Sequence, residues 1–181
     1  MNLWSSLFRN RFAQEAVQRT IYWVDLTGGR LCSPAYADDA GLDLYVSQDT
    51  EILPRVVMLG STGPNGKPEL LMRKPTDVPC GIRVAMPPSV AALVVGRSSS
   101  VKRGLTVHLT LIDPGYRGDL FVFVSNDTEE PITLERGTRV AQLMPVPSLA
   151  SALHLARVGS VDDLPPSDRG ARGFGSSGGT R

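Results

Sequence analysis

The sequence predicts an all-β fold of the sandwich, jelly-roll or barrel type. Short apolar segments recur along the 181 residues and are separated by turn-forming pairs such as Pro114-Gly115, Asn126-Asp127 and Arg136-Gly137. Several of these segments alternate between apolar and polar residues, which is the period of a half-buried strand. The chain also contains 18 Gly and 14 Pro and few long periodic apolar runs. These features are typical of many short strands joined by turns and not of a helical bundle.

The individual strands follow from the same pattern. Segment 105–112 is the clearest, because polar and apolar residues alternate from Leu105 to Leu111. Residues 60–67 form a loop between two predicted strands, and the Asn65-Gly66 pair suits a hairpin tip. A short helix is expected near 151–158. The predicted strands are 21–26, 42–46, 55–59, 70–73, 81–86, 91–95, 105–112, 119–125, 132–135 and 140–146.

Composition limits the classes of function. Lys and Arg number 19 against 18 Asp and Glu, so the net charge is +1. That balance argues against nucleic acid as a partner and requires any anion site to be local. No apolar stretch approaches the roughly 18 residues that a membrane span needs. Cys32 and Cys80 lack metal-ligand spacing, which predicts inert, reduced thiols in the cytoplasm, or in the cytoplasm or nucleus of a host cell if the protein is viral.

The length favours a single domain with its own core, flanked by two segments of different composition. Residues 1–20 are predicted to be an N-terminal extension without the features of a secretory signal. The β domain is predicted over 21–160. Residues 161–181 are rich in Gly and Ser and have few large apolar groups. Such a segment cannot bury enough surface to hold itself in place, so we expect a mobile C-terminal arm.

Five segments concentrate residue types that handle phosphate, base or metal. Arg97 and the serines after it offer a guanidinium and hydroxyl groups to an anion. Asp113 and Tyr116 lie three residues apart where a predicted strand runs into a turn. Each segment alone has an ordinary explanation as a turn or a polar loop, but five in order are not explained by chance. The segments are 40–44, 96–100, 111–118, 137–143 and 169–178.

Together these motifs resemble the homotrimeric dUTPase family. The most specific are the third, Ile-Asp-x-x-Tyr-Arg-Gly, and the fifth, Arg-Gly-x-x-Gly-Phe-Gly-Ser-Ser-Gly. The resemblance covers nearly the whole chain apart from the first twenty residues and 60–67. It implies a β jelly roll and a homotrimer whose active sites are assembled from more than one subunit. It also implies hydrolysis of dUTP to dUMP and pyrophosphate, which keeps uracil out of DNA and supplies dUMP.

The same resemblance implies roles for residues around the phosphates. Asp113 would be the catalytic base that activates the water attacking the α-phosphorus, a task that requires hydrogen-bond reach of that water. Arg97, Ser98 and Ser99 would grip the phosphates. Mg²⁺ would be held mainly by the triphosphate and by waters, as is usual for this ion, with Asp43 and Gln142 contacting those waters.

Further roles concern the nucleoside and the arm that closes over it. Tyr116 would pack against the deoxyribose and leave no room for a 2′-hydroxyl group. Backbone groups of the third-motif hairpin would read uracil. The resemblance implies that this hairpin contributes Val107, Thr110, Leu111 and Ile112. In the arm, Arg169 would clamp the γ-phosphate, Phe174 would stack on uracil, and Gly175, Ser176 and Ser177 would complete the contacts.

One alternative is deamination of dCTP, alone or combined with dUTP hydrolysis. The dUTPase family usually carries Gly at the position of Thr110, whereas Val107-His108-Leu109-Thr110 before Asp113 resembles the related dCTP deaminases. Those deaminases place a Glu five residues after the Gly that closes the third motif. This chain has Phe123 there, which argues against deamination. His108 has no acidic or cysteine neighbours in sequence and is predicted to be a hydrogen-bonded structural residue.

A second alternative is a dUTPase-fold binding protein. It would contact a regulator or a host factor through residues 60–67 or through the N-terminal extension. Segment 60–67 is longer than most turns of compact β domains, and long loops are often functional.

Overall fold

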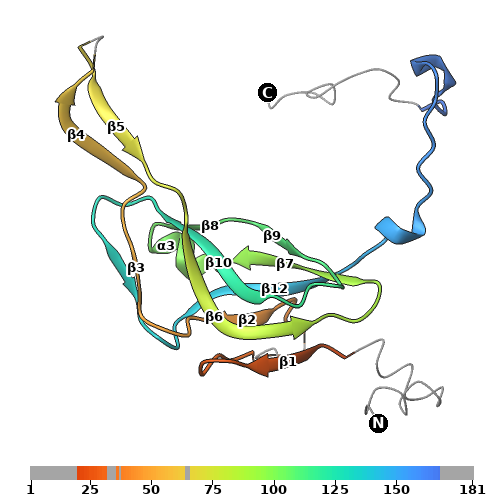
Figure 1. Cartoon of the computed structure of the whole chain (residues 1–181), viewed down its shortest axis with the longest axis horizontal. Helices are drawn as coiled ribbons and strands as arrows, with labels where there is room; N and C mark the ends of the chain where they lie inside the picture. Colours follow the sequence, from red (N-terminus) through yellow and green to blue (C-terminus); the bar gives the residue numbers. More distant parts are fainter. Residues whose placement is uncertain (1–19, 32–35, 37, 64–65, 168–181) are drawn as a thin grey trace. The chain divides into compact units, whose positions relative to one another are not determined.

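The computed structural model describes residues 20–31, 36, 38–63 and 66–167 and is built almost entirely from antiparallel strands (Figure 1). This confirms the predicted all-β jelly roll. One sheet contains, in spatial order, β1 (Tyr22–Asp25), β6 (Thr76–Ala85), β10 (Asp119–Asn126) and β8 (Leu105–Val107). The other contains β2 (Leu42–Tyr45), β12 (Arg139–Pro147), β7 (Val90–Gly96) and β9 (Thr110–Ile112).

Two small two-stranded sheets and one short helix complete the domain. β3 (Thr50–Ile52) pairs with β11 (Ile132–Leu134), and β4 (Val56–Thr62) pairs with β5 (Pro68–Met72). The short helix α3 (Ser98–Lys102) joins β7 to β8. Strand alternation buries one face of each large sheet, because successive side chains point to opposite faces. The residues buried in this way form one apolar core that includes Leu44, Val78, Ile82, Val94, Leu120, Val122 and Leu143.

Asn126 closes the end of this core. Its side chain is fully buried, and its Nδ2 donates to the carbonyl oxygens of Ile52 at 2.9 Å and Glu130 at 2.7 Å. Its Oδ1 accepts from the backbone N–H and the hydroxyl group of Thr128. A buried amide is tolerated only when its donors and acceptors are satisfied. The four contacts therefore fasten the end of β10 to β3 and to the following turn.

The predicted strand 105–112 is in fact two strands in different sheets. β8 pairs with β10, whereas β9 pairs with β7. His108 and Leu109 carry the chain from one sheet to the other, and His108 Nε2 lies 2.8 Å from the hydroxyl oxygen of the buried Ser125. This confirms a hydrogen-bonded histidine. The polarity pattern cannot show the crossover, because both halves bury one face of the same core.

Other elements also differ from the prediction. β3 and α3 were not predicted, because three and five residues are too short to show a period. β6 begins at Thr76 and not at residue 81, since Pro79 and Gly81 interrupt the pattern. The expected helix at 151–158 is wrong. A single 3₁₀ turn occupies Ala150–Ala152, and no helix follows before the second 3₁₀ turn at Val161–Asp163.

The predicted hairpin tip at Gly66 is confirmed, but the loop is shorter than 60–67. Residues 60–62 belong to β4, and Pro68 begins β5. Gly66 has φ +73°, a left-handed conformation that glycine adopts without steric cost. Its N–H donates to the carbonyl oxygen of Gly63 at 3.0 Å.

The chain divides into two compact units, residues 1–149 and 150–181. The predicted boundaries at residues 20 and 160 remain predictions. In the part of the chain that the structure describes, no helix is long and apolar enough to cross a bilayer. Cys80 is a free, buried thiol, and burial raises its pKa to about 12. Cys32 lies outside the described residues.

Replacing Asn126 tests how much its network contributes. Asn126→Ala leaves the carbonyl groups of Ile52 and Glu130 without their donor. We expect the free energy of unfolding to fall by about 2–4 kcal/mol, since each unsatisfied buried group costs about 1–3 kcal/mol. Chemical denaturation at matched protein concentration measures this. The exposed neighbour is the control, and Asp127→Asn should cost under about 1 kcal/mol. Equal stability of the two variants would contradict the role given to Asn126.

Candidate active site

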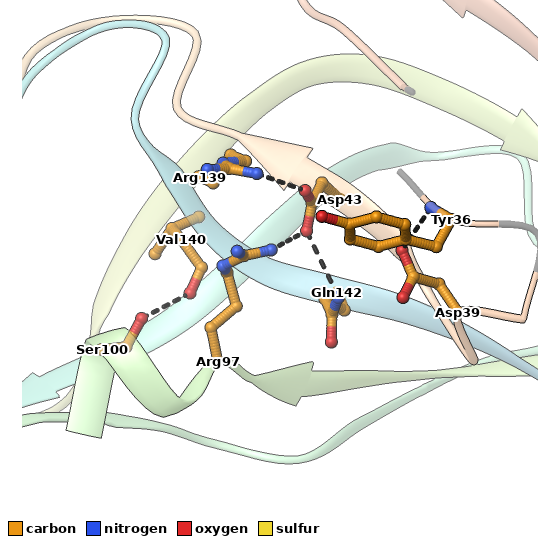
Figure 2. A network of polar contacts seen from close by, with 8 residues as sticks. All are labelled: Tyr36, Asp39, Asp43, Arg97, Ser100, Arg139, Val140 and Gln142. Atoms are coloured by element: carbon orange, nitrogen blue, oxygen red, sulfur yellow. Dashed lines mark hydrogen bonds and ion pairs between the residues drawn. The ribbon is translucent and has the colours of Figure 1, made fainter. Parts of the chain in front are cut away.

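Three of the predicted site residues meet at one end of the second sheet. In the strand order β2-β12-β7, Gln142 pairs with Asp43 on one side and with Val95 on the other. Arg97 follows the last residue of β7, so its side chain lies next to both (Figure 2). Strand register therefore brings together residues from the first, second and fourth motifs.

The carboxylate of Asp43 is the centre of this cluster, and its side chain is only 14% exposed. It accepts hydrogen bonds from Arg97 Nη1, from Gln142 Nε2 at 3.3 Å and from Arg139 Nη1 at 3.3 Å. Two guanidinium groups thus share one carboxylate. These three charged side chains carry a net charge of +1, which Asp39 nearby partly offsets, and the surplus next to Arg97 favours an anionic ligand.

Arg97 is the member best prepared to change partner. Its side chain is 20% exposed, and its Nε is buried without a hydrogen-bond partner among the described residues. Burial lowers the pKa of the Arg97 guanidinium, the charge of Arg139 lowers it further, and Asp39 opposes them. A cation that is partly desolvated and crowded by a second cation gains most from an incoming anion. A phosphate group can supply both the charge and the missing acceptor.

The serines after Arg97 divide into two kinds. Ser100 is buried, and its hydroxyl donates to the carbonyl oxygen of Val140 at 2.9 Å, which fastens α3 to β12. Ser98 and Ser99 are exposed. They remain accessible to a ligand, in keeping with their predicted role at the phosphates.

The third motif forms a separate pocket of about 240 Å³. Asp113 is exposed just after β9, and the N–H of Tyr116 donates to its carbonyl oxygen at 3.0 Å, closing a turn. Tyr116 donates through its hydroxyl to the carbonyl oxygen of Asp119 at 2.7 Å. A Cβ on Gly118 would lie 2.6 Å from that hydroxyl, so a larger residue there would push the Tyr116 ring aside. The pocket is lined by Thr110, Leu111, Ile112, Tyr116, Asp119, Leu120, Phe121 and Phe123.

Most of the predicted base-binding residues lie at this pocket. Thr110, Leu111 and Ile112 form β9 and line it. Val107 does not line it, because β8 belongs to the other sheet and its side chain packs against Gly96. Phe123, at the position where the deaminases carry Glu, is an apolar wall of the same pocket.

Asp113 and Arg97 do not meet within one chain. Ile112 pairs with Ala92, near the beginning of β7, whereas Arg97 follows its end. The five residue-to-residue steps from Ala92 to Arg97 span about 16 Å along a strand. A single phosphate group cannot contact both side chains across that separation. Within the described residues, one chain therefore holds two half-sites and no complete site.

Arg139 is a site residue that the sequence did not identify. A register shift in β12 between Arg139 and Ala141 lets Arg139 and Gln142, three positions apart, both reach Asp43. Regular alternation would place them on opposite faces. The sequence feature that could have pointed to Arg139 is its place in the fourth motif, residues 137–143. Arg169, Phe174, Gly175, Ser176 and Ser177 lie outside the described residues, so their predicted roles remain predictions.

Comparison with known proteins agrees with this arrangement. The family model for dUTPase matches residues 28–178. The deoxyuridine 5′-triphosphate nucleotidohydrolase of Leifsonia xyli subsp. xyli is 43% identical over 159 residues, covering 86% of this chain and 90% of that protein. The dUTPase of Staphylococcus bacteriophage 80alpha with dUPNHPP has a TM-score of 0.68 and 22% identity, covering 88% of this chain and 99% of that one.

A second solved structure has the same fold. A mutant dUTPase from phage phi11 of S. aureus, named for the coordination of a structural Mg(II) ion, has a TM-score of 0.63 and 18% identity. It covers 78% of this chain and 98% of its own length. At these identities the two phage structures support the fold. The family model and the 43% identical relative show that this chain belongs to the dUTPase family.

Proposed function

We propose that this protein hydrolyses dUTP to dUMP and pyrophosphate. The observation that carries the proposal is the cluster of Asp43, Arg97 and Gln142. In it the Arg97 guanidinium is largely buried, and its Nε has no acceptor among the described residues, so a phosphate oxygen can supply one. The second half-site supplies what the reaction also needs, a carboxylate on a rigid strand end beside an aromatic pocket. Family membership assigns the substrate class.

In the proposed reaction, the carboxylate of Asp113 accepts a proton from a water molecule. The water oxygen forms a bond to the α-phosphorus while the bond to the α,β-bridging oxygen breaks. Pyrophosphate leaves with that electron pair, and dUMP keeps the new oxygen. Negative charge grows on the bridging oxygen, so donors placed there lower the barrier. Arg97, Ser98 and Ser99 are the groups that we assign to this task.

Mg²⁺ is the metal that we propose for this site. Asp43 and Gln142 offer two side-chain oxygen donors next to each other, which fits an ion that keeps most of its water. When bound, Mg²⁺ would neutralise charge on the triphosphate. Asp43 can face the metal-bound waters once Arg97 turns from its carboxylate to a phosphate. Among the described residues, no group of three or more His, Cys, Asp or Glu is placed to hold a metal.

The two half-sites support an assembly of copies, for which we propose the homotrimer of the family resemblance. One copy supplies Asp113 and Tyr116, and another supplies Asp43, Arg97 and Gln142. Such contacts are head-to-tail, and a head-to-tail contact that closes on itself forms a ring. We further propose that residues 161–181, with Arg169 and Phe174, close over the bound nucleotide. The free thiol of Cys80 supports a cytoplasmic location, or the host cytoplasm or nucleus for a viral protein.

The pocket beside Asp113 supports plain hydrolysis over deamination. Attack on C4 of cytosine needs a carboxylate to move protons, and Phe123 offers none at the position where the deaminases carry Glu. The carboxylate that does line the pocket, Asp119, is paired with Arg83 at 2.5 Å. We expect pyrophosphate release from dUTP and none from dTTP or UTP when each is supplied with Mg²⁺. Pyrophosphate and ammonia are measured in parallel. Ammonia release from dCTP would overturn the choice of hydrolysis.

Mixing two inactive variants tests the divided site. Asp113→Asn and Arg97→Gln should each lose most activity as pure proteins. After joint refolding at equal amounts, about a quarter of the sites should pair an intact Asp113 with an intact Arg97 from different copies. Activity should therefore recover to about a quarter of that of the unmodified protein.

A matched pair provides the control for this mixing experiment. Asp113→Asn and Tyr116→Ala alter the same half-site, so no mixed site has both residues intact on one copy. We expect no recovery from that pair. Failure of the first pair to recover, with assembly intact by sedimentation, would show that each chain forms its own site.

Arg139→Gln tests the residue that the structure adds to the site. Arg139 is half exposed, so its loss should change the free energy of unfolding by less than about 1 kcal/mol. Asp43 would lose the donor that orients it once Arg97 has turned to a phosphate. We expect KM to rise by about three- to tenfold with kcat little changed, which is less than the loss of about 1.5–3 kcal/mol typical of a hydrogen bond to a charged group, because the half-exposed Arg139 is screened by water. Steady-state kinetics measure this, with the exposed Arg103→Gln as control. An unchanged KM would remove Arg139 from the site.

A further inference from the structure

The hairpin β4–β5 is the largest feature that the proposed reaction does not use. It projects away from the two large sheets (Figure 1). Each strand packs mainly against the other, and the isolated ribbon is rich in exposed apolar side chains. A two-stranded hairpin on its own is marginally stable in water. Exposed apolar patches of this kind mark surfaces that another molecule covers.

The strand register defines the face that needs covering. Val56 lies opposite Met72, and Met58 lies opposite Leu70, so these four side chains share one face. Their exposed fractions are 48%, 61%, 70% and 57%. Val57 and Leu71 pair on the other face, so the ribbon is apolar on both sides. We call the first of these the ribbon face.

A groove runs along the base of the ribbon face. Its volume is about 870 Å³. Its lining includes the apolar side chains of Val56, Val57, Met58 and Leu70 from the hairpin and residues 127–129 after β10. Arg55 and Asp127, which also line it, form an ion pair at 3.5 Å. The groove thus combines apolar and polar lining residues at the base of the hairpin.

The hairpin rises from the end of the sandwich that carries Arg97. The N–H of Arg55 donates to the carbonyl oxygen of Asn126 at 2.7 Å, and the N–H of Asp127 donates to that of Gly104 at 2.8 Å. Gly104 follows α3, and Arg97 is the residue that caps the beginning of that helix. The copy that brings Asp113 to the phosphates must approach this same end. The hairpin would then stand beside it.

Charge favours the body of a second copy, and not that copy's own hairpin, as the surface that covers the ribbon face. In residues 55–74, four basic residues face a single acid, Glu69, which gives this segment a net charge of +3. The rest of the chain carries −2, because the total is +1. Two hairpins would repel each other, whereas a hairpin and the body of another copy attract. The basic residues are Arg55, Lys67, Arg73 and Lys74.

We propose that the hairpin β4–β5 is an assembly arm whose ribbon face packs against the neighbouring copy, next to the shared active site. The contact of residues 60–67 with a regulator or a host factor, raised by the sequence as an alternative, remains a prediction and is separate from this proposal. The copy that supplies Asp113 also exposes Leu109 shortly before it, at 68%. This is an apolar side chain of the kind that the groove accepts. The proposal rests on the divided site of the proposed function.

Two variants of the full chain test the arm. The double variant Met58→Ser with Leu70→Ser removes apolar surface from the ribbon face. A second variant replaces residues 56–72 by an Asn-Gly turn. That deletion can close, because the N–H of Arg73 already donates to the carbonyl oxygen of Arg55 at 2.8 Å. Val101→Ser, at a residue that is 70% exposed on α3, is the control for loss of an exposed apolar side chain.

The measurement is sedimentation over a dilution series, with specific activity assayed at each concentration. We expect both hairpin variants to dissociate at concentrations at least tenfold higher than the unmodified protein and the control. At high concentration their activity should stay within twofold of normal. Unchanged dissociation in both variants would contradict the proposal that the hairpin is an assembly arm. The ribbon face would then be assigned to a different partner.

Failure of the arm and failure of the divided site give different results. The mixed Asp113→Asn and Arg97→Gln proteins could fail to recover activity while the hairpin variants still dissociate at higher concentrations than the unmodified protein. That result would support the assembly arm and contradict the divided site. If the mixture recovers while the hairpin variants assemble normally, the divided site holds and the arm does not. Circular dichroism at high concentration confirms that each variant is folded.

Discussion

The carboxylate of Asp43 is the group on which the phosphate-binding half of this protein depends. It is nearly buried and is shared by Arg97, Arg139 and Gln142. One negative charge cannot balance two guanidinium groups, so the cluster keeps a positive charge in the absence of ligand. Arg97 also keeps a buried Nε without an acceptor among the described residues. A polyphosphate relieves both deficits, which is how an ion-pair cluster becomes a binding site.

The geometry of β7 decides how that half-site is completed. β7 carries Arg97 at its end, and it pairs near its beginning with the strand that leads to Asp113. A strand is too stiff to bring its own ends together. The same short element that fixes each half-site with precision therefore keeps them apart. In the proposed trimer, assembly of copies would convert this separation into complete sites at subunit boundaries, with the basic, apolar hairpin beside them.

The sequence predicted the strands of the large sheets because polar and apolar residues alternate along them around one core. It did not predict β3 or α3, which are too short to show a period. It joined β8 to β9, because a crossover at His108 and Leu109 leaves the polarity pattern intact. These failures share a cause, since pairing partners are set by tertiary contacts and not by local composition.

The site was predicted in part for a similar reason. Motifs identified Asp43, Arg97, Gln142, Asp113 and Tyr116 through resemblance, but their division into two half-sites comes from the register of β2, β12, β7 and β9. Arg139 was missed because it reaches Asp43 through a register shift that no local pattern encodes. The resemblance also assigned Val107 to uracil, and that role remains a prediction, since Val107 lies on β8 in the other sheet and does not line the pocket beside β9.

A crystal structure of the protein with Mg²⁺ and a non-hydrolysable dUTP analogue tests the central claim most directly. The account predicts that the phosphates contact Arg97 of one copy while Asp113 of another copy faces the α-phosphorus. Asp43 should then have released Arg97 and kept Arg139. A nucleotide contacted by Arg97 and Asp113 of the same chain would contradict the account.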